Sequence, residues 1–355
     1  MTHAMSPRTL PSAETSMQVE PALSPHLQLI ESGAALWKAR AIYAAAELGL
    51  ADLLATGPRC VKELAQCSGT HEPSLYRLLR SLAGCGVFRE LEHRRFELTE
   101  LGSALKKGAP GAARATLLTI AGDWQWHAWQ HLLHTLRTGE TGLRKAFGTE
   151  LFPFLAANPQ HEAAFNEAMV GMYGDLGAML AEAYDFSSIR KVIDIGGGTG
   201  RLIAAILKRH KNAFGAVFEL PQAAVEAQRF FSAASLDSRC EVIEGDFFES
   251  IPAGYDAYIL AHVLHDWDDG RVVSILRNCR RSIPSEGRLL IVEALLPDND
   301  APHHGKMMDL LMMTVAGGAE RTATEFSKLL AAADFAVTRV LATATHQSII
   351  EAQPV

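Results

Sequence analysis

The chain has 355 residues, of which 48% are hydrophobic and 21% charged, and its formal net charge is -7. This length exceeds that of a usual single domain, so we expect two domains with a full hydrophobic core. The negative charge argues against a general nucleic-acid binder, and five scattered cysteines without a CxxC pair argue against a disulfide framework and a thiolate zinc site.

The first residues of the chain predict no folded element. Residues 1–25 are rich in Ser, Thr and Pro and lack the apolar core of a secretory signal, so we expect a disordered tail. No apolar run reaches membrane-spanning length without a charge. We therefore expect a cytoplasmic protein that does not bind membranes.

Residues 26–110 predict a winged-helix-like domain. From 26 to about 48 apolar residues recur at helical spacing among many alanines, which allows close packing of a second helix. Helices are then predicted over 61–65 and 73–82, followed by a β-hairpin over 87–91 and 95–98. The second of these helices offers only Arg77 and Arg80 for phosphate contacts, and glutamates lie among the basic residues. We expect dimerisation or substrate capping rather than DNA binding.

Residues 111–185 predict a helical linker or substrate-capping region. Trp124, Trp126 and Trp129 are close together, which is typical of a core or of an apolar pocket for a flat ligand. His127, His131 and His134 could share one helix face, which raises a metal-site hypothesis. Surface or core histidines are the more common case, so we expect no metal.

Residues 186–355 alternate between strand and helix signals, with helices between the first five strands and before the sixth. This pattern predicts an α/β fold with a doubly wound, Rossmann-like sheet whose last two strands form an antiparallel hairpin. The predicted strands are 191–195, 215–219, 240–244, 256–262, 288–293, 335–341 and 347–352.

The first of these strands runs into a glycine-rich turn. Asp194, Gly196, Gly198 and Gly200 form the pattern Asp-x-Gly-x-Gly-x-Gly. The dinucleotide fingerprint fails because Arg201 stands where its last glycine is needed, and no Gly-Lys-Ser/Thr of a phosphate loop follows. The turn resembles the first motif of S-adenosylmethionine (SAM) methyltransferases, whose ligand has no phosphate. A purely structural turn is the alternative.

Acidic side chains end the strands that follow the turn. Glu219 ends the second strand, where a carboxylate reaches a ribose diol. Asp246 and Phe247 follow the third strand, where they could contact an adenine or simply form a capped turn.

A histidine and two carboxylates follow the fourth and fifth strands and the loop before the last predicted helix. His265 lies in Leu-His-Asp-Trp-Asp-Asp, Glu293 ends the fifth strand, and Glu320 lies in Gly-Gly-Ala-Glu-Arg-Thr. A histidine held by carboxylates is the arrangement of a general base.

These ordered motifs resemble the O-methyltransferases of the plant caffeic acid/flavonoid and bacterial antibiotic-tailoring type, from about residue 27 to the C-terminus. The resemblance implies a homodimer with SAM as cofactor, His265 as base between Glu293 and Glu320, and Asp266 beside the acceptor. It implies cofactor contacts from Gly196, Gly198, Gly200, Glu219, Asp246 and Phe247, and an acceptor pocket walled by Met169, Met308 and Met312.

The resemblance has one departure and leaves two questions open. Plant members often carry a lysine four residues before the base, where this chain has Ala261, followed by His262, so cofactor contacts on that side stay open.

We expect methylation of a phenolic secondary metabolite such as a phenazine or polyketide. The alternative is a SAM-binding hydroxylase or decarboxylase of the same fold, which retention of the base disfavours. The acceptor itself and the number of hydroxyls methylated stay open.

Overall fold

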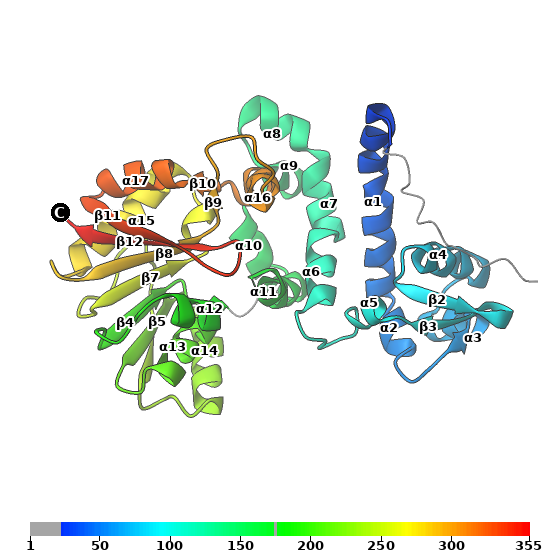
Figure 1. Cartoon of the computed structure of the whole chain (residues 1–355), viewed down its shortest axis with the longest axis horizontal. Helices are drawn as coiled ribbons and strands as arrows, with labels where there is room; N and C mark the ends of the chain where they lie inside the picture. The colour runs from blue at the N-terminus through cyan, green and yellow to red at the C-terminus, as the bar shows by residue number, and fades with distance from the viewer. Residues whose placement is uncertain (1–22, 174–175) are drawn as a thin grey trace, which may run out of the picture.

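The computed structural model describes residues 23–173 and 176–355, so residues 1–22 of the predicted tail lie outside the described part. An N-terminal domain, a central group of helices and a C-terminal sheet domain follow one another along the longest axis (Figure 1). Within the described residues, no helix combines the length and the apolar character that crossing a membrane requires.

The N-terminal domain has the predicted helix–turn–helix–hairpin order. Leu64, Leu79, Leu82 and Phe96 are fully buried in its core. The hairpin is antiparallel and pairs Leu91 with Arg95; a short third strand, which the sequence pattern did not predict, is added beside it. The elements are α1 (Pro25–Glu47), α2 (Leu50–Leu53), β1 (Arg59–Cys60), α3 (Val61–Ser68), α4 (Glu72–Gly84), β2 (Phe88–Leu91), β3 (Arg95–Leu98) and α5 (Glu100–Ser103).

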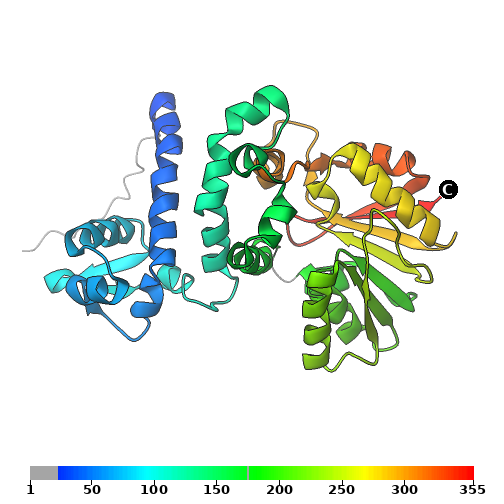
Figure 2. The same cartoon turned by 180° about the vertical axis from the view of Figure 1, so that it is seen from behind.

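The central region is helical, and α1 lies beside it in both views (Figures 1 and 2). Arg40 of α1 donates to the carbonyl of Ala121 at 2.6 Å and to Asp123 at 2.8 Å. The helices are α6 (Ala113–Ile120), α7 (Asp123–Gln130), α8 (Leu132–Thr138), α9 (Gly142–Phe147), α10 (Leu151–Ala156), α11 (Pro159–Tyr173) and α12 (Leu176–Ala183).

Trp124 of the predicted tryptophan cluster belongs to the hydrophobic core of the central helices. Trp124 is buried against Phe154 in the core of the central helices. None of the three clustered tryptophans lines the large cavity described below, so the pocket alternative for them is wrong.

The three histidines do not share one helix, since α7 ends before His131, and His134 instead contacts Glu140 at 2.6 Å.

The C-terminal domain contains a seven-stranded sheet in the order β11-β12-β8-β7-β4-β5-β6. Its first five strands in chain order are parallel, and β11 and β12 form the predicted antiparallel hairpin. β12 also pairs antiparallel with β8, which the sequence did not predict. The strands are β4 (Lys191–Ile195), β5 (Phe214–Glu219), β6 (Cys240–Glu244), β7 (Ala257–Ala261), β8 (Arg288–Glu293), β11 (Phe335–Ala342) and β12 (Ser348–Pro354).

One predicted element of this domain is absent. No helix forms between β6 and β7, where residues 245–256 make turns and irregular backbone. Pro252 and Gly254 interrupt this segment, and Gly254 has a φ of 99°, which a helix does not accommodate. A small parallel pair, β9 (Leu295–Leu296) with β10 (Arg321–Thr322), was not predicted either.

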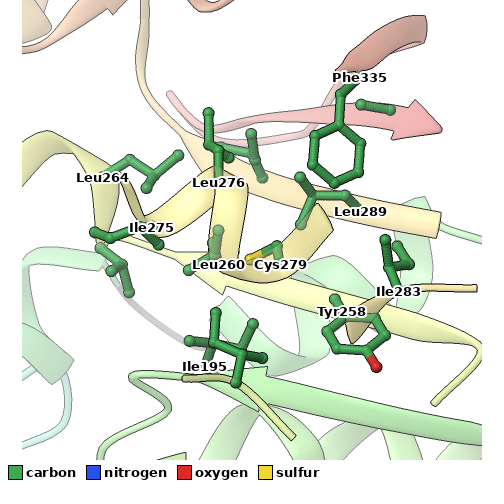
Figure 3. Packing of buried hydrophobic residues seen from close by; sticks show 14 of the residues in the cluster. Ile195, Tyr258, Leu260, Leu264, Ile275, Leu276, Cys279, Ile283, Leu289 and Phe335 are labelled. Carbon is green, nitrogen blue, oxygen red and sulfur yellow. The ribbon is translucent and has the colours of Figure 1, made fainter. Parts of the chain in front are cut away.

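Helices cover both faces of the sheet, which makes it doubly wound. The faces are separated by the alternation of side chains along each strand. One face packs on α15 (Asp269–Ser282) and α17 (Ala323–Ala331), and the other on α12, α13 (Arg201–Arg209) and α14 (Pro221–Ala233). In the first core, Leu264 lies close to Ile275 and Leu276 of α15 (Figure 3). This packing anchors the turn that carries His265.

Two glycines of the turn after β4 provide a matched test of its packing. Both have a positive φ, 54° at Gly198 and 76° at Gly200, but a Cβ at Gly200 would lie 2.3 Å from the ring of Phe231, whereas one at Gly198 meets nothing within 4 Å. We expect Gly200→Ala to lower the free energy of unfolding by about 3 kcal/mol and Gly198→Ala by about 1 kcal/mol, measured by urea denaturation. Equal losses would contradict the packing role of Gly200.

Candidate active site

A cavity of about 1300 Å³ opens at the carboxyl ends of β4, β5 and β7. Open α/β sheets bind ligands at this edge. The wall includes the glycine turn after β4, the turn that follows β7, and the central helices α6, α7, α10 and α11. The cavity is larger than a pocket for one small ligand, so it has room for two substrates side by side.

The glycine turn forms one side of this cavity. Gly196 donates its backbone N–H to the carbonyl of Phe218 at 2.8 Å, which ties the turn to β5. Gly196 and Gly198 line the cavity. Gly200 does not line it: this glycine precedes the first turn of α13 and packs against Phe231, so its place in the motif is explained by packing.

The carboxyl groups of Asp194 and Glu219 lie next to the glycine turn. Glu219 accepts hydrogen bonds from the backbone N–H of Gly198 at 3.0 Å and of Leu220 at 2.8 Å, and it lines the cavity. Burial raises its pKa. Burial, and then the charge of Glu219, raise the pKa of Asp194 to about 8. The two acids therefore offer hydrogen-bonding groups to a polar ligand at this end of the cavity.

The loop after β6 adds an aromatic face. Asp246 and Phe247 both line the cavity. The side chain of Asp246 also accepts a hydrogen bond from the backbone N–H of Phe248 at 2.7 Å. The capped turn that the sequence offered as an alternative is therefore present, and it leaves Asp246 on the cavity wall. Asn278 of α15 donates to the carbonyls of Phe247 at 2.7 Å and Phe248 at 3.0 Å. Sequence reasoning missed Asn278, because nothing in a helix sequence indicates which distant loop its amide will hold.

His265 lies in a short 3₁₀ turn after β7, between carboxylates from two other segments. Its Nδ1 donates to Oε1 of Glu320 at 2.9 Å and lies 3.5 Å from Oε2 of Glu293. Glu293 also accepts from the backbone N–H groups of Leu264 at 3.0 Å and His265 at 3.3 Å. His265 lines the cavity, and its Nε2 lies 3.7 Å from Asp266. The structure thus brings His265, Glu293, Glu320 and Asp266 together.

The charges of this cluster set its protonation. Burial disfavours the imidazolium, but the charges of Glu293, Asp266 and Glu320 outweigh it and raise the pKa of His265 to about 10. Burial raises the pKa of Glu293 to about 7 and that of Asp266 to about 6, although His265 opposes both shifts. The arrangement produces a strongly basic imidazole whose Nδ1 is committed to Glu320, leaving Nε2 for a ligand.

A buried arginine fixes the turn that carries His265. Arg321 donates to the carbonyls of Leu264 at 3.1 Å, Trp267 at 2.7 Å and Ala319 at 3.0 Å, and to Asp269 at 2.9 Å. These bonds hold the turn after β7 and the loop before α17 as one unit. The motif Gly-Gly-Ala-Glu-Arg-Thr contained this residue, but only the fold shows what its guanidinium holds.

The loop that carries Glu320 is packed closely against the same turn. The N–H of Ala319 donates to the carbonyl of His265 at 2.9 Å, and a Cβ at Gly318 would lie 1.9 Å from that oxygen. Asp309 accepts from the N–H of Glu320 at 2.9 Å. The position therefore requires glycine at 318, and the loop has little freedom to move Glu320 away from His265.

The opposite side of the cavity is mainly apolar. Asp266, Met169, Met308 and Met312 all line it, together with Phe152 of α10. The ring of Phe152 stacks on Trp267 with centroids 5.7 Å apart. The methionines come from α11, α16 (His304–Leu311) and the adjoining π-helix Met312–Ala316. The structure thus places the three predicted methionines on the wall of the same cavity as the glycine turn.

His262 lies in the region that the sequence left open. It follows the end of β7 with a φ of 54°, lines the cavity, and has its ring centroid 5.3 Å from that of His265. Burial, and then the charge of His265, hold its pKa well below the usual range. In the described part of the chain, donor atoms of His262, His265 and Glu293 lie within 4.8 Å of one another.

The chain matches two family models: the O-methyltransferase domain over residues 92–336 and the O-methyltransferase dimerisation domain over residues 31–108. It is 44% identical over 319 residues to the phenazine O-methyltransferase PhzM of Lysobacter antibioticus, covering 90% of this chain and 93% of that protein. It is 35% identical to the aclacinomycin 10-hydroxylase RdmB of Streptomyces purpurascens, covering 84% of this chain and 81% of that protein.

Solved structures agree with these matches. The crystal structure of LaPhzM has a TM-score of 0.89 at 43% identity, covering 94% of this chain and 100% of that chain. The O-methyltransferase NcsB1, solved with SAM and 2-hydroxy-5-methyl naphthoic acid, has a TM-score of 0.80 at 34% identity, covering 90% of this chain and 96% of that chain. The chain therefore belongs to the O-methyltransferase family that carries a dimerisation domain. It is a SAM-dependent O-methyltransferase.

The charge coupling inside the cluster predicts how His265 titrates. We expect the pKa of His265 to lie far above 6.5 and to fall in Glu320→Gln, because removing a neighbouring negative charge destabilises the imidazolium. NMR titration of the histidine-labelled protein measures it. Glu325→Gln, which removes a carboxylate from the cap of α17 instead, is the control. A pKa that does not change in Glu320→Gln would contradict the coupling.

Proposed function

We propose that this enzyme transfers the methyl group of SAM to a phenolic hydroxyl of a flat aromatic secondary metabolite, such as a phenazine or a polyketide. The observation that carries the proposal is the position of His265. Its imidazole opens into the same cavity as the glycine turn, between the acidic end and the apolar end. Similarity to a phenazine O-methyltransferase supports the substrate class.

The acidic end of the cavity fits the cofactor. SAM supplies an activated methyl group on a sulfonium ion. Glu219 would accept hydrogen bonds from the ribose hydroxyls, Asp246 and Phe247 would contact the adenine end, and Gly196 and Gly198 would let the backbone approach the ligand. The wall of the cavity beside Gly198 is open to a ligand, because a Cβ there meets no atom within 4 Å.

The chemistry required of the protein is proton removal and alignment. A phenol has a pKa near 10, so an unperturbed histidine of pKa 6.5 would accept its proton at a cost of roughly 5 kcal/mol. The carboxylates raise the pKa of His265 to about 10, which brings the proton affinity of its imidazole close to that of a phenolate. Only the neutral imidazole can accept the phenol proton, so we expect turnover to rise as the pH increases toward the pKa of His265. In this proposal Glu320 and Glu293 are positioning residues that fix the Nδ1–H tautomer, and Asp266 lies beside the acceptor oxygen.

A hydroxylase is the second candidate function, because RdmB shares the family. Such a reaction adds an oxygen atom to the product, whereas methyl transfer adds one methyl group. The complete His265–Glu293–Glu320 cluster favours methyl transfer, since a deprotonating base with two supporting carboxylates serves the acceptor hydroxyl directly. We further propose that the active form is a homodimer built through the dimerisation domain.

The base assignment is tested by removing His265. We expect His265→Ala to lower methyl transfer by about 100-fold or more while SAM still binds, because general base catalysis contributes roughly that factor. Product masses are measured with methyl-labelled SAM and a panel of hydroxyphenazines, hydroxyanthraquinones and phenolic acids. His127→Ala, exposed on α7 and outside the cavity, is the control. Unchanged turnover would refute the base, and a product heavier by one oxygen would establish the hydroxylase.

The ribose assignment is tested at Glu219. We expect Glu219→Ala to weaken SAM binding by about 10-fold or more, because hydrogen bonds to an ionised carboxylate are lost. Calorimetry measures the dissociation constant. Glu244→Ala removes an exposed carboxylate at the end of the neighbouring strand β6 and should leave it unchanged. Equal affinity of the wild type and Glu219→Ala would exclude the ribose contact.

A further inference from the structure

The corner between α6 and α7 carries two buried polar side chains on the cavity wall. Thr119 lies in the last turn of α6 and is 1% exposed, and Gln125 lies in the first turn of α7 and is 3% exposed. In the described part of the chain, Oγ1 of Thr119 and Oε1 of Gln125 have no hydrogen-bond partner. Buried polar atoms are nearly always paired in native proteins. Two unpaired ones at the same corner of a ligand cavity therefore indicate that a ligand completes them.

The surroundings of this corner are apolar and uncharged. The wall from α10, α11, α16 and the adjoining π-helix includes the apolar residues Phe152, Phe165, Met169, Met172, Met308 and Met312, and one uncharged polar residue, Asn166. The lysine and arginine side chains on the cavity wall within the described residues are Arg201, Lys208 and Arg209, all on α13 beside the glycine turn. Arg201 packs over the ring of Phe230 on α14, at 5.3 Å. No described lysine or arginine therefore lines the part of the wall that belongs to α6, α7, α10 and α11.

The corner is held rigidly by the backbone and by α1. A Cβ at Gly122, between the two helices, would lie 2.2 Å from the carbonyl of Leu118, so the turn is as tight as glycine allows. Arg40 donates to the carbonyl of Ala121 at 2.6 Å and to Asp123 at 2.8 Å. Rigid placement lowers the cost of ordering Thr119 and Gln125 around a ligand.

We propose that Thr119 and Gln125 form a recognition subsite for a neutral hydrogen-bonding group of the acceptor, such as a carboxamide, carbonyl, hydroxyl or ring nitrogen, away from the reacting hydroxyl. The proposal rests on the proposed function, because it takes this end of the cavity as the acceptor end. The amide of Gln125 and the hydroxyl of Thr119 can each donate and accept. A carboxylate in the same place would be buried without a cation, so the subsite selects uncharged aromatic phenols over aromatic carboxylates.

Binding of matched acceptors tests the selection independently of turnover. The probes are 1,4-dihydroxy-2-naphthamide and 1,4-dihydroxy-2-naphthoic acid, titrated by calorimetry into the full-length enzyme saturated with S-adenosylhomocysteine. We expect the amide to bind about 100-fold more tightly than the acid, because only the acid brings an unpaired buried charge. Equal affinity, or tighter binding of the acid, would overturn the proposal. Selective binding without methylation of any acceptor would instead contradict the proposed function and leave the subsite standing.

Two substitutions test the residues themselves. Gln125→Met and Thr119→Val remove the hydrogen-bonding groups at nearly constant volume, and we expect each to weaken binding of the amide about 5-fold without changing the affinity for S-adenosylhomocysteine. Gln130→Met makes the same chemical change at an exposed position of α7 and is the control. Unchanged amide affinity in both Gln125→Met and Thr119→Val would overturn the assignment. Cofactor affinity and thermal unfolding verify that each variant is folded.

Discussion

The buried charges around His265 are the constraint on which the rest of the site depends. An imidazole that is 4% exposed faces carboxylates that are 0% exposed at Glu293 and 5% exposed at Glu320. Taking such charges out of water is costly unless each finds its partner, so none of the three can be misplaced without a large loss of stability. Because Glu293 ends β8, Glu320 precedes α17 and His265 follows β7, their pairing fixes three distant segments relative to one another. Arg321 also stabilises this unit, because its guanidinium donates hydrogen bonds to the backbone carbonyls of Leu264 and Trp267 in the turn.

This constraint also divides the cavity into two chemically different ends. The charged cluster lies between a glycine turn flanked by Asp194 and Glu219 and a wall of methionine and phenylalanine side chains. Polar and cationic ligand atoms are favoured at the first end, and flat apolar rings at the second. In the proposed reaction, His265 accepts the proton between the two substrates.

The sequence predicted those features that local residue patterns determine. Parallel strands are buried on both faces, so they appear as apolar runs that end at turn residues, and all seven main strands were found. The glycine turn was found because a turn with positive φ at successive alternate residues favours glycine at those positions. The prediction failed where tertiary contacts decide. A helix was expected between β6 and β7, but Pro252 and Gly254 prevent it. The packing of Gly200 on Phe231 likewise could not be predicted from the local pattern. Asn278, Thr119 and Gln125 carry no local signal, because their significance depends on which distant atoms they face.

The N-terminal domain lines no described part of the cavity but supports its wall indirectly, through Arg40 of α1. Trp37, near the middle of α1, is 75% exposed and lies in the matched dimerisation domain, and Leu36 beside it is 39% exposed. Three residues further along, Arg40 of the same helix holds the corner between α6 and α7. A partner that covers Trp37 also restrains the helix that carries Arg40, because an α-helix transmits position along its axis with little bending over one turn. In the proposed homodimer, contacts of α1 with a partner and the proposed subsite of Thr119 and Gln125 would therefore be linked through one helix.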